Sequence, residues 1–195
     1  VIFSDGYQST TTYNAHTGHF ISTTGGAWIL EDDMLIETVE FDSAQAERVG
    51  TEVRTKVLVE AEQFTKIDDD SSYTAIDHGA PGALQGAWLM SGRVQDGATQ
   101  MRATDGPRKT MKILSGTRFQ WIAYNTETKQ FMGTGGGTYT TTDGVYTEHI
   151  EFFSRDDTRV GASLTFEYKL VDGQWHHSGK SSKGDPIHEI WQTRA

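Results

Sequence analysis

The sequence contains no cysteine and only three prolines in 195 residues. Without cysteine, a disulfide framework, a cysteine-based zinc site and a thiol nucleophile are all excluded. No apolar run approaches the roughly 20 residues that a membrane-spanning helix requires. We therefore expect no membrane insertion, and we expect neither a bound metal nor a cofactor.

Basic residues are also scarce. The 17 lysines and arginines are outnumbered by 27 aspartates and glutamates, which gives a formal net charge of −10. An acidic surface repels the phosphate backbone, so nucleic acid is not an expected partner. The same charge disfavours docking on an anionic membrane, and its simplest role is to keep the protein soluble.

Glycine, threonine and tyrosine are well represented, and 35% of the residues are hydrophobic. This composition can build a core and is typical of strands joined by glycine-containing turns. In residues 160–170 the apolar side chains fall on every second position, which predicts a strand with one buried face. We find no segment with a convincing helical pattern, so the expected fold class is all-β.

The chain repeats itself at an offset of 111 residues, which takes Ile2 to Ile113 without a gap. The strongest matches are short blocks of residues that are identical in the two copies. They are Tyr13-Asn14 with Tyr124-Asn125, Gly25-Gly26 with Gly136-Gly137, Glu40-Phe41 with Glu151-Phe152, and Arg48-Val49-Gly50 with Arg159-Val160-Gly161. A run of this kind indicates an internal duplication.

The duplication divides the chain into a first unit at residues 1–66, a polar linker at 67–83 and a second, complete unit at 84–195. The second unit opens with a strand near residues 86–91 that the first unit lacks. The first unit therefore either lost its first strand or borrows one, and a homodimer completed by a partner's strand is one alternative.

Eight short strands are predicted in the second unit, near residues 86–91, 110–115, 118–125, 130–134, 145–154, 160–171, 174–179 and 187–193. Strands of this length and spacing are typical of a sandwich or an antiparallel up-and-down barrel. Eight strands can close a barrel that is filled by side chains or that holds one small ligand.

The triplet Gly86-Ala87-Trp88 on the first strand and Arg194 after the last strand carry a resemblance to lipocalins. In that family a first-strand Trp packs beneath a late Arg at the closed end of the barrel. The unit also resembles the short lipocalin-like (calycin-type) domains of secreted bacterial proteins of unknown function. The resemblance implies tandem barrels and an exported protein, either secreted or periplasmic. It does not imply one chemistry, because functions in this superfamily range from carrier to enzyme.

Glu148 is the first candidate for chemistry, because it shares a strand face with Tyr146, Ile150 and Phe152 that we place inside the barrel. A glutamate desolvated there has a raised pKa unless a cation pairs with it, and it could act as an acid or base. The alternative is a structural glutamate held by Arg159 or by a tyrosine hydroxyl.

Four histidines lie in the second unit at positions where the first unit has other residues, and His177 is the one that could join Glu148. Adjacent strand residues point to opposite faces, so His176 and His177 cannot both enter one barrel. The spacing matches no metal-ligand pattern, and surface or hydrogen-bonded histidines are the simpler interpretation.

Aromatic and polar side chains of the second unit could line a pocket, or they could simply fill the barrel. The candidate ligand-binding residues are Trp121, Tyr124, Tyr146, Glu148, Arg159, Phe166 and Tyr168. The glycines of residues 133–137 are interpreted as a bend or bulge, because no phosphate-loop helix follows them.

Three functions remain open. The first is binding of a small apolar or mixed-polarity ligand in a barrel cavity. The second is a cavity enzyme of the hydratase, cyclase or isomerase type that uses Glu148 with His177. The third is a structural or interaction module with filled barrels.

Overall fold

A computed structural model describes residues 1–77, 82–181 and 183–194, and the fold is all-β as predicted. The first sheet contains β1 (Ile2–Ser4), β2 (Tyr7–Tyr13), β3 (Phe20–Glu31), β4 (Met34–Asp42), β5 (Glu52–Val59), β6 (Gln63–Lys66) and β7 (Ser71–Thr74). The second contains β8 (Gly86–Gln95), β9 (Ala98–Met101), β10 (Arg108–Leu114), β11 (Arg118–Asn125), β12 (Gln130–Thr142), β13 (Val145–Phe153), β14 (Ser163–Val171), β15 (Gln174–Lys180) and β16 (Pro186–Thr193). Two single-turn 3₁₀ segments follow β4 and β13, namely η1 (Ala46–Arg48) and η2 (Asp157–Arg159).

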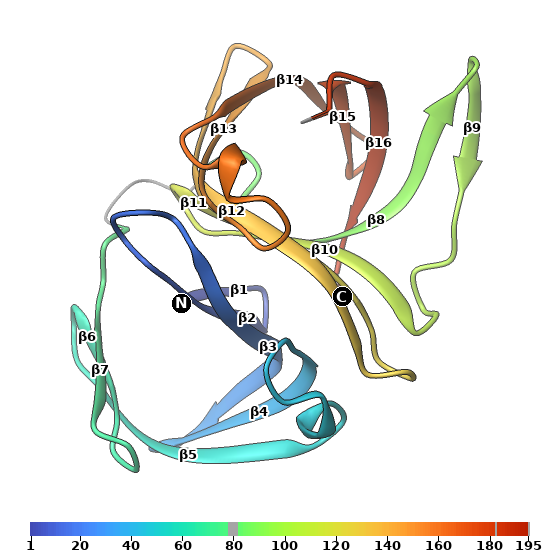
Figure 1. The fold of residues 1–195 in the computed structure, drawn as a ribbon. Coiled ribbons are helices and arrows are strands. Elements are labelled where there is room, and N and C mark those ends of the chain that lie inside the picture. The colour runs from blue at the N-terminus through green and yellow to red at the C-terminus, as the bar shows by residue number, and fades with distance from the viewer. Residues whose placement is uncertain (78–81, 182, 195) are drawn as a thin grey trace.

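The second sheet closes on itself as an antiparallel barrel (Figure 1). Strands β10 to β16 pair in sequence order, β16 pairs with β8, and β8 pairs with β10. The hairpin partner of β8, strand β9, lies outside this ring and was not among the eight strands predicted for this unit. The predicted up-and-down barrel is confirmed for this unit.

The first sheet stays open as a half-barrel beside the closed one (Figure 1). Within the described residues, β1 pairs with β2 alone and β7 pairs with β6 alone. At the 111-residue offset β1 corresponds to β10, and β8 has no counterpart in the described part of this unit. The prediction of an incomplete first unit is therefore confirmed.

Part of the predicted linker belongs to the first sheet. Strand β7 pairs with β6 through residues 71–74, after a turn in which Asp70 adopts a positive φ of 57°. Tyr73 supplies the large side chain that this short strand packs against Phe64. Residues 78–81 of the predicted linker lie outside the described residues.

The duplication extends to strand register. Tyr7 lies opposite Ala27 in the first unit, and Arg118 lies opposite Thr138 in the second. The register shifts at Gly25/Gly26 in one unit and at Gly136/Gly137 in the other. A Cβ on Gly137, whose φ is +158°, would lie 2.0 Å from the carbonyl oxygen of His149. The predicted glycine bulge is confirmed and requires glycine for this close approach.

This bulge corrects one face assignment. Tyr146, Glu148 and Ile150 lie inside the closed barrel as predicted, but Phe152 does not. Its ring packs instead on Tyr13 of the first unit, with 4.8 Å between centroids. The extra residue reverses the alternation of the strand, so a strict period of two fails beyond it.

The two units pack through the outer faces of corresponding strands, as expected for a pseudo-twofold relation. Phe20 stacks on its own counterpart Phe131 with 6.0 Å between ring centroids. Ser9 Oγ donates a hydrogen bond of 2.7 Å to its counterpart Gln120. The contact of Tyr13 with Phe152 is repeated by a contact of Tyr124 with Phe41.

Candidate functional site

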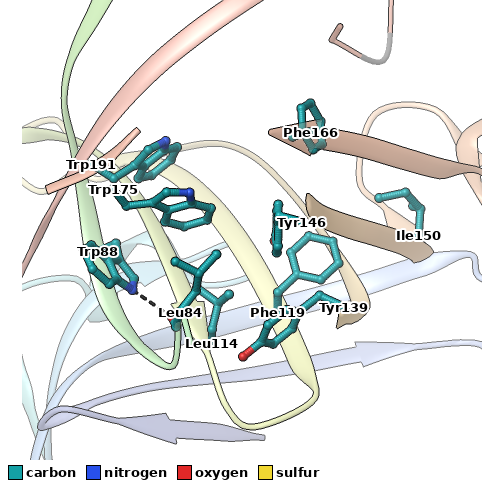
Figure 2. Close-up of a cluster of buried hydrophobic side chains, with 10 residues drawn as sticks. All are labelled: Leu84, Trp88, Leu114, Phe119, Tyr139, Tyr146, Ile150, Phe166, Trp175 and Trp191. Carbon is teal, nitrogen blue, oxygen red and sulfur yellow. Dashed lines mark hydrogen bonds between the residues drawn. The ribbon is translucent and has the colours of Figure 1, made fainter. Parts of the chain in front are cut away.

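Side chains fill the interior of the closed barrel (Figure 2). The indoles of Trp175 and Trp191 lie next to each other, and the indole nitrogen of Trp88 donates a 2.9 Å hydrogen bond to the Leu84 carbonyl. The full set is Leu84, Trp88, Leu114, Phe119, Tyr139, Tyr146, Ile150, Phe166, Trp175 and Trp191. The second unit thus uses its aromatic residues mainly as core.

A buried ion pair lies within this core. Lys112 Nζ is 2.7 Å from Glu148 Oε1, and the two side chains are only 5% and 6% exposed. The Tyr146 hydroxyl donates a second hydrogen bond of 3.0 Å to the same oxygen. The ammonium also lies 5.0 Å from the ring centroids of Tyr146 and Trp175. Glu148 therefore has the inward position that the sequence predicted, with a lysine as its cation.

Arg159, the partner that the sequence suggested for Glu148, lies elsewhere. Its guanidinium is 3.3 Å from Asp156 and packs over the ring of Phe153. Strand β10 was predicted, but Lys112 was overlooked as a partner. The available signal was a single lysine among the apolar side chains of residues 111–114.

His177 enters the closed barrel, whereas His176 faces away and meets His188, with 3.1 Å between ring nitrogens. Burial and the nearby charge of Lys112 lower the pKa of His177, which favours the neutral imidazole. Its Nδ1 lies 3.5 Å from a carboxylate oxygen of Glu189. In the described part of the chain, no hydrogen bond joins His177 to Glu148.

The remaining predicted residues separate into two groups. Phe166 is buried in the barrel core, and Tyr168 and Trp121 pack against that core while partly exposed. Tyr124 lies at the junction between the units and donates a 2.6 Å hydrogen bond to Glu40. The structure thus brings together Tyr146, Glu148, Phe166 and His177, but not Tyr124 or Arg159.

Arg194 also differs from the lipocalin pattern. Its guanidinium binds both carboxylate oxygens of Glu40 at 2.5 and 2.7 Å and lies over the Tyr7 ring at 3.9 Å. It therefore joins the last strand of the second unit to the first unit. The expected packing of Arg194 over Trp88 is replaced by this contact.

A cleft of about 800 Å³ lies in the first unit. It begins on the concave face of the half-barrel, passes the short strand β1 and ends against β11 and β13 of the closed barrel. Four of its lining residues correspond, at the 111-residue offset, to buried core residues of the closed barrel. Phe3, Trp28, Leu35 and Phe64 match Leu114, Tyr139, Tyr146 and Trp175.

The cleft is therefore the uncovered core of a barrel. In the closed unit, Trp88 of β8 and Trp191 of β16 cover the equivalent surface. The described part of the first unit has no strand equivalent to β8. The sequence did not predict this site, because the candidate ligand-binding residues were all placed in the second, complete unit.

Aromatic rings form a continuous row along the cleft. Phe3 lies 5.0 Å from Trp28 and 5.7 Å from Phe64, both in edge-to-face geometry. Phe64 in turn lies 5.8 Å from Tyr73 of β7. Such a row presents both ring faces and ring edges to a bound molecule.

Polar groups surround one end of the cleft. Glu151 accepts hydrogen bonds of 2.7 Å from the Tyr13 hydroxyl and 2.5 Å from Arg118. Burial, together with the bond to Glu151 and its charge, raises the pKa of Tyr13 to about 12. The Asp77 carboxylate accepts hydrogen bonds from the Ser115 hydroxyl and from the Thr117 amide, the latter at 2.8 Å. These contacts hold the wall of the cleft against the closed barrel.

Within residues 1–77, 82–181 and 183–194, no group of three or more His, Cys, Asp or Glu residues is arranged to hold a metal ion. In the same described residues, no helix is long and apolar enough to cross a membrane.

A family model described as "Domain of unknown function (DUF4488)" matches residues 83–194, which cover the closed barrel. The search of curated proteins finds no match to this chain.

Proposed function

The chain belongs to the DUF4488 family, and we propose, from the shape and lining of its cleft, that it binds a small apolar or mixed-polarity ligand. The binding site is the cleft of the half-barrel. The closed barrel, which carries the family match, supports the open unit and forms one wall of the cleft.

One observation carries this proposal, namely that the aromatic core of the first unit lies open where the second unit buries it. A cleft of about 800 Å³ falls within the range of small-molecule sites, which are mostly apolar with a few polar groups. Binding of a ligand that removes this exposed apolar surface from water is favourable in free energy.

A lipocalin-like relationship is part of the proposal. The up-and-down barrel of eight antiparallel strands and the buried first-strand Trp88 support it. The outward position of Arg194 is a departure from the lipocalin pattern.

The structural or interaction module remains a second candidate for the closed barrel, because the barrel is filled. The cavity-enzyme alternative has less support, since Glu148 is engaged by Lys112 and Tyr146 inside that packing. Export and a homodimer completed by a partner's strand also remain proposals. Fractionation of the source cells and native mass spectrometry test them.

Binding of the neutral fluorophore N-phenyl-1-naphthylamine tests the cleft. We expect saturable binding with a stoichiometry of one. Substituting Ala75→Trp should weaken binding by about tenfold or more, because Ala75 lines the cleft and an indole there occupies it. Ala44→Trp is the matched control at an exposed position outside the cleft. Absence of saturable binding, or equal weakening by both variants, would contradict the proposal.

A further inference from the structure

We infer that the cleft selects a cationic amphiphile, that is, a small molecule with an ammonium-type head and an apolar tail. This inference rests on the proposed function of the same cleft. It adds the sign of the ligand's charge, which the apolar lining alone does not determine.

The charged side chains of the lining are the first argument. Among the described residues, four carboxylates line the cleft, those of Glu60, Glu62, Asp77 and Glu151, against two cationic groups, the guanidinium of Arg118 and the amino group of Val1. That guanidinium is paired with Glu151 at 2.5 Å. A concave surface with an excess of one sign of charge raises the local concentration of ligands of the opposite sign. A cationic head is therefore complementary to the lining, whereas an anionic head is repelled by it.

The aromatic row is the second argument. Ring faces carry negative electrostatic potential and attract ammonium groups within about 6 Å of the centroid. Phe3, Trp28, Phe64 and Tyr73 form such a row along the cleft. Aromatic rings and carboxylates together bind a cation with an apolar body better than either does alone.

The closed barrel offers an internal example of the same chemistry. The ammonium of Lys112 lies 5.0 Å from the Trp175 ring and 5.3 Å from the Trp191 ring, and it pairs with Glu148. At the 111-residue offset, Phe64 of the first unit corresponds to Trp175, and Val1 corresponds to Lys112. The aromatic surface that receives a lysine in one unit is thus open in the other.

Glu37, the counterpart of Glu148, is not the charge that a ligand would meet. Its carboxylate accepts a 2.6 Å hydrogen bond from Gln8 and lies 3.6 Å from the ammonium of Lys66. The ligand's cation is therefore assigned to Glu60 and Glu62, which line the cleft and are exposed.

Three eight-carbon probes with different heads test the inference, namely octyltrimethylammonium, octanol and octanoate, measured by isothermal titration calorimetry at low salt. We expect octyltrimethylammonium to bind about tenfold or more tighter than octanoate, with octanol between them. The double variant Glu60→Gln/Glu62→Gln should weaken only the cationic probe, by about threefold to tenfold. The control Glu127→Gln/Glu167→Gln changes the net charge equally at exposed positions outside the cleft.

The outcomes separate the two proposals. Equal binding of all three probes, or tighter binding of octanoate, would overturn the charge preference while leaving a ligand-binding cleft. Equal weakening by the control variant would assign the preference to the net charge of the protein and overturn its location. Failure of all three probes to bind would overturn the cleft as a ligand site and the inference with it.

Discussion

The buried pair of Lys112 and Glu148 makes the most direct test of how the closed barrel is held together. Replacing Lys112 by methionine removes the ammonium and leaves the Glu148 carboxylate inside the aromatic core, where the Tyr146 hydroxyl is its one remaining hydrogen-bond partner among the described residues. The two side chains are 5% and 6% exposed, so water cannot replace the lost cation. Breaking one partner of a buried pair costs about 3–5 kcal/mol of unfolding free energy.

The double variant Lys112→Met/Glu148→Leu should recover most of that loss. Removing both charges eliminates the desolvation cost, and buried pairs replaced by apolar side chains are commonly neutral or stabilising. We expect the double variant to lie within about 2 kcal/mol of the natural protein. Urea unfolding followed by tryptophan fluorescence reports on this core directly, because Trp88, Trp175 and Trp191 surround the pair.

Lys56→Met serves as the control, since Lys56 pairs with Asp33 at 3.0 Å with both side chains more than half exposed. Such a surface pair contributes less than about 1 kcal/mol. This account of the pair would be refuted if Lys112→Met lost less than about 1 kcal/mol of unfolding free energy. It would also be refuted if the double variant lost as much unfolding free energy as the single variants Lys112→Met and Glu148→Leu lose together.

Four further predictions concern the barrel and the junction. Burial lowers the pKa of His177 in the folded protein below its unfolded value of about 6.5, so the folded protein loses stability as the pH falls below that value. His177→Gln should therefore flatten the dependence of the urea midpoint on pH between about pH 7 and 5. An unchanged dependence would exclude this histidine as the cause. Gly137→Ala should cost about 2 kcal/mol or more in urea unfolding, because its Cβ would meet the His149 carbonyl at 2.0 Å, whereas Gly106→Ala, with open space around it, should cost much less. Glu40→Gln should lower the unfolding free energy by about 1–3 kcal/mol, because the Arg194 and Tyr124 contacts that join the units weaken; an unchanged melting temperature would argue against that role. The pKa of Tyr13, raised to about 12, should fall toward its usual value in Glu151→Gln, as followed by ultraviolet absorbance during alkaline titration, and no change would mean that burial alone sets it.

Local patterns in the sequence determined much of the fold. Alternation with a period of two identifies strands wherever one face is buried, as in residues 163–171, and turn signals such as Asp172-Gly173 separate them. The duplication was visible in the sequence because both units keep the same glycines, and the structure gives the two units the same strand register and the same glycine bulges. The inward position of Glu148 followed from the same alternation.

Partners and cavities were decided by the tertiary structure. Whether Glu148 meets Lys112 or Arg159 depends on which strands become neighbours when the sheet closes, and no local pattern carries that information. Tyr124 and Arg194 face the other unit instead of a barrel interior, since the packing of the two units determines which outer surface is buried. The cleft arises because one sheet closes and its duplicate remains open. The same core positions are therefore buried structure in one unit and accessible surface in the other, and only the spatial arrangement of the strands distinguishes them.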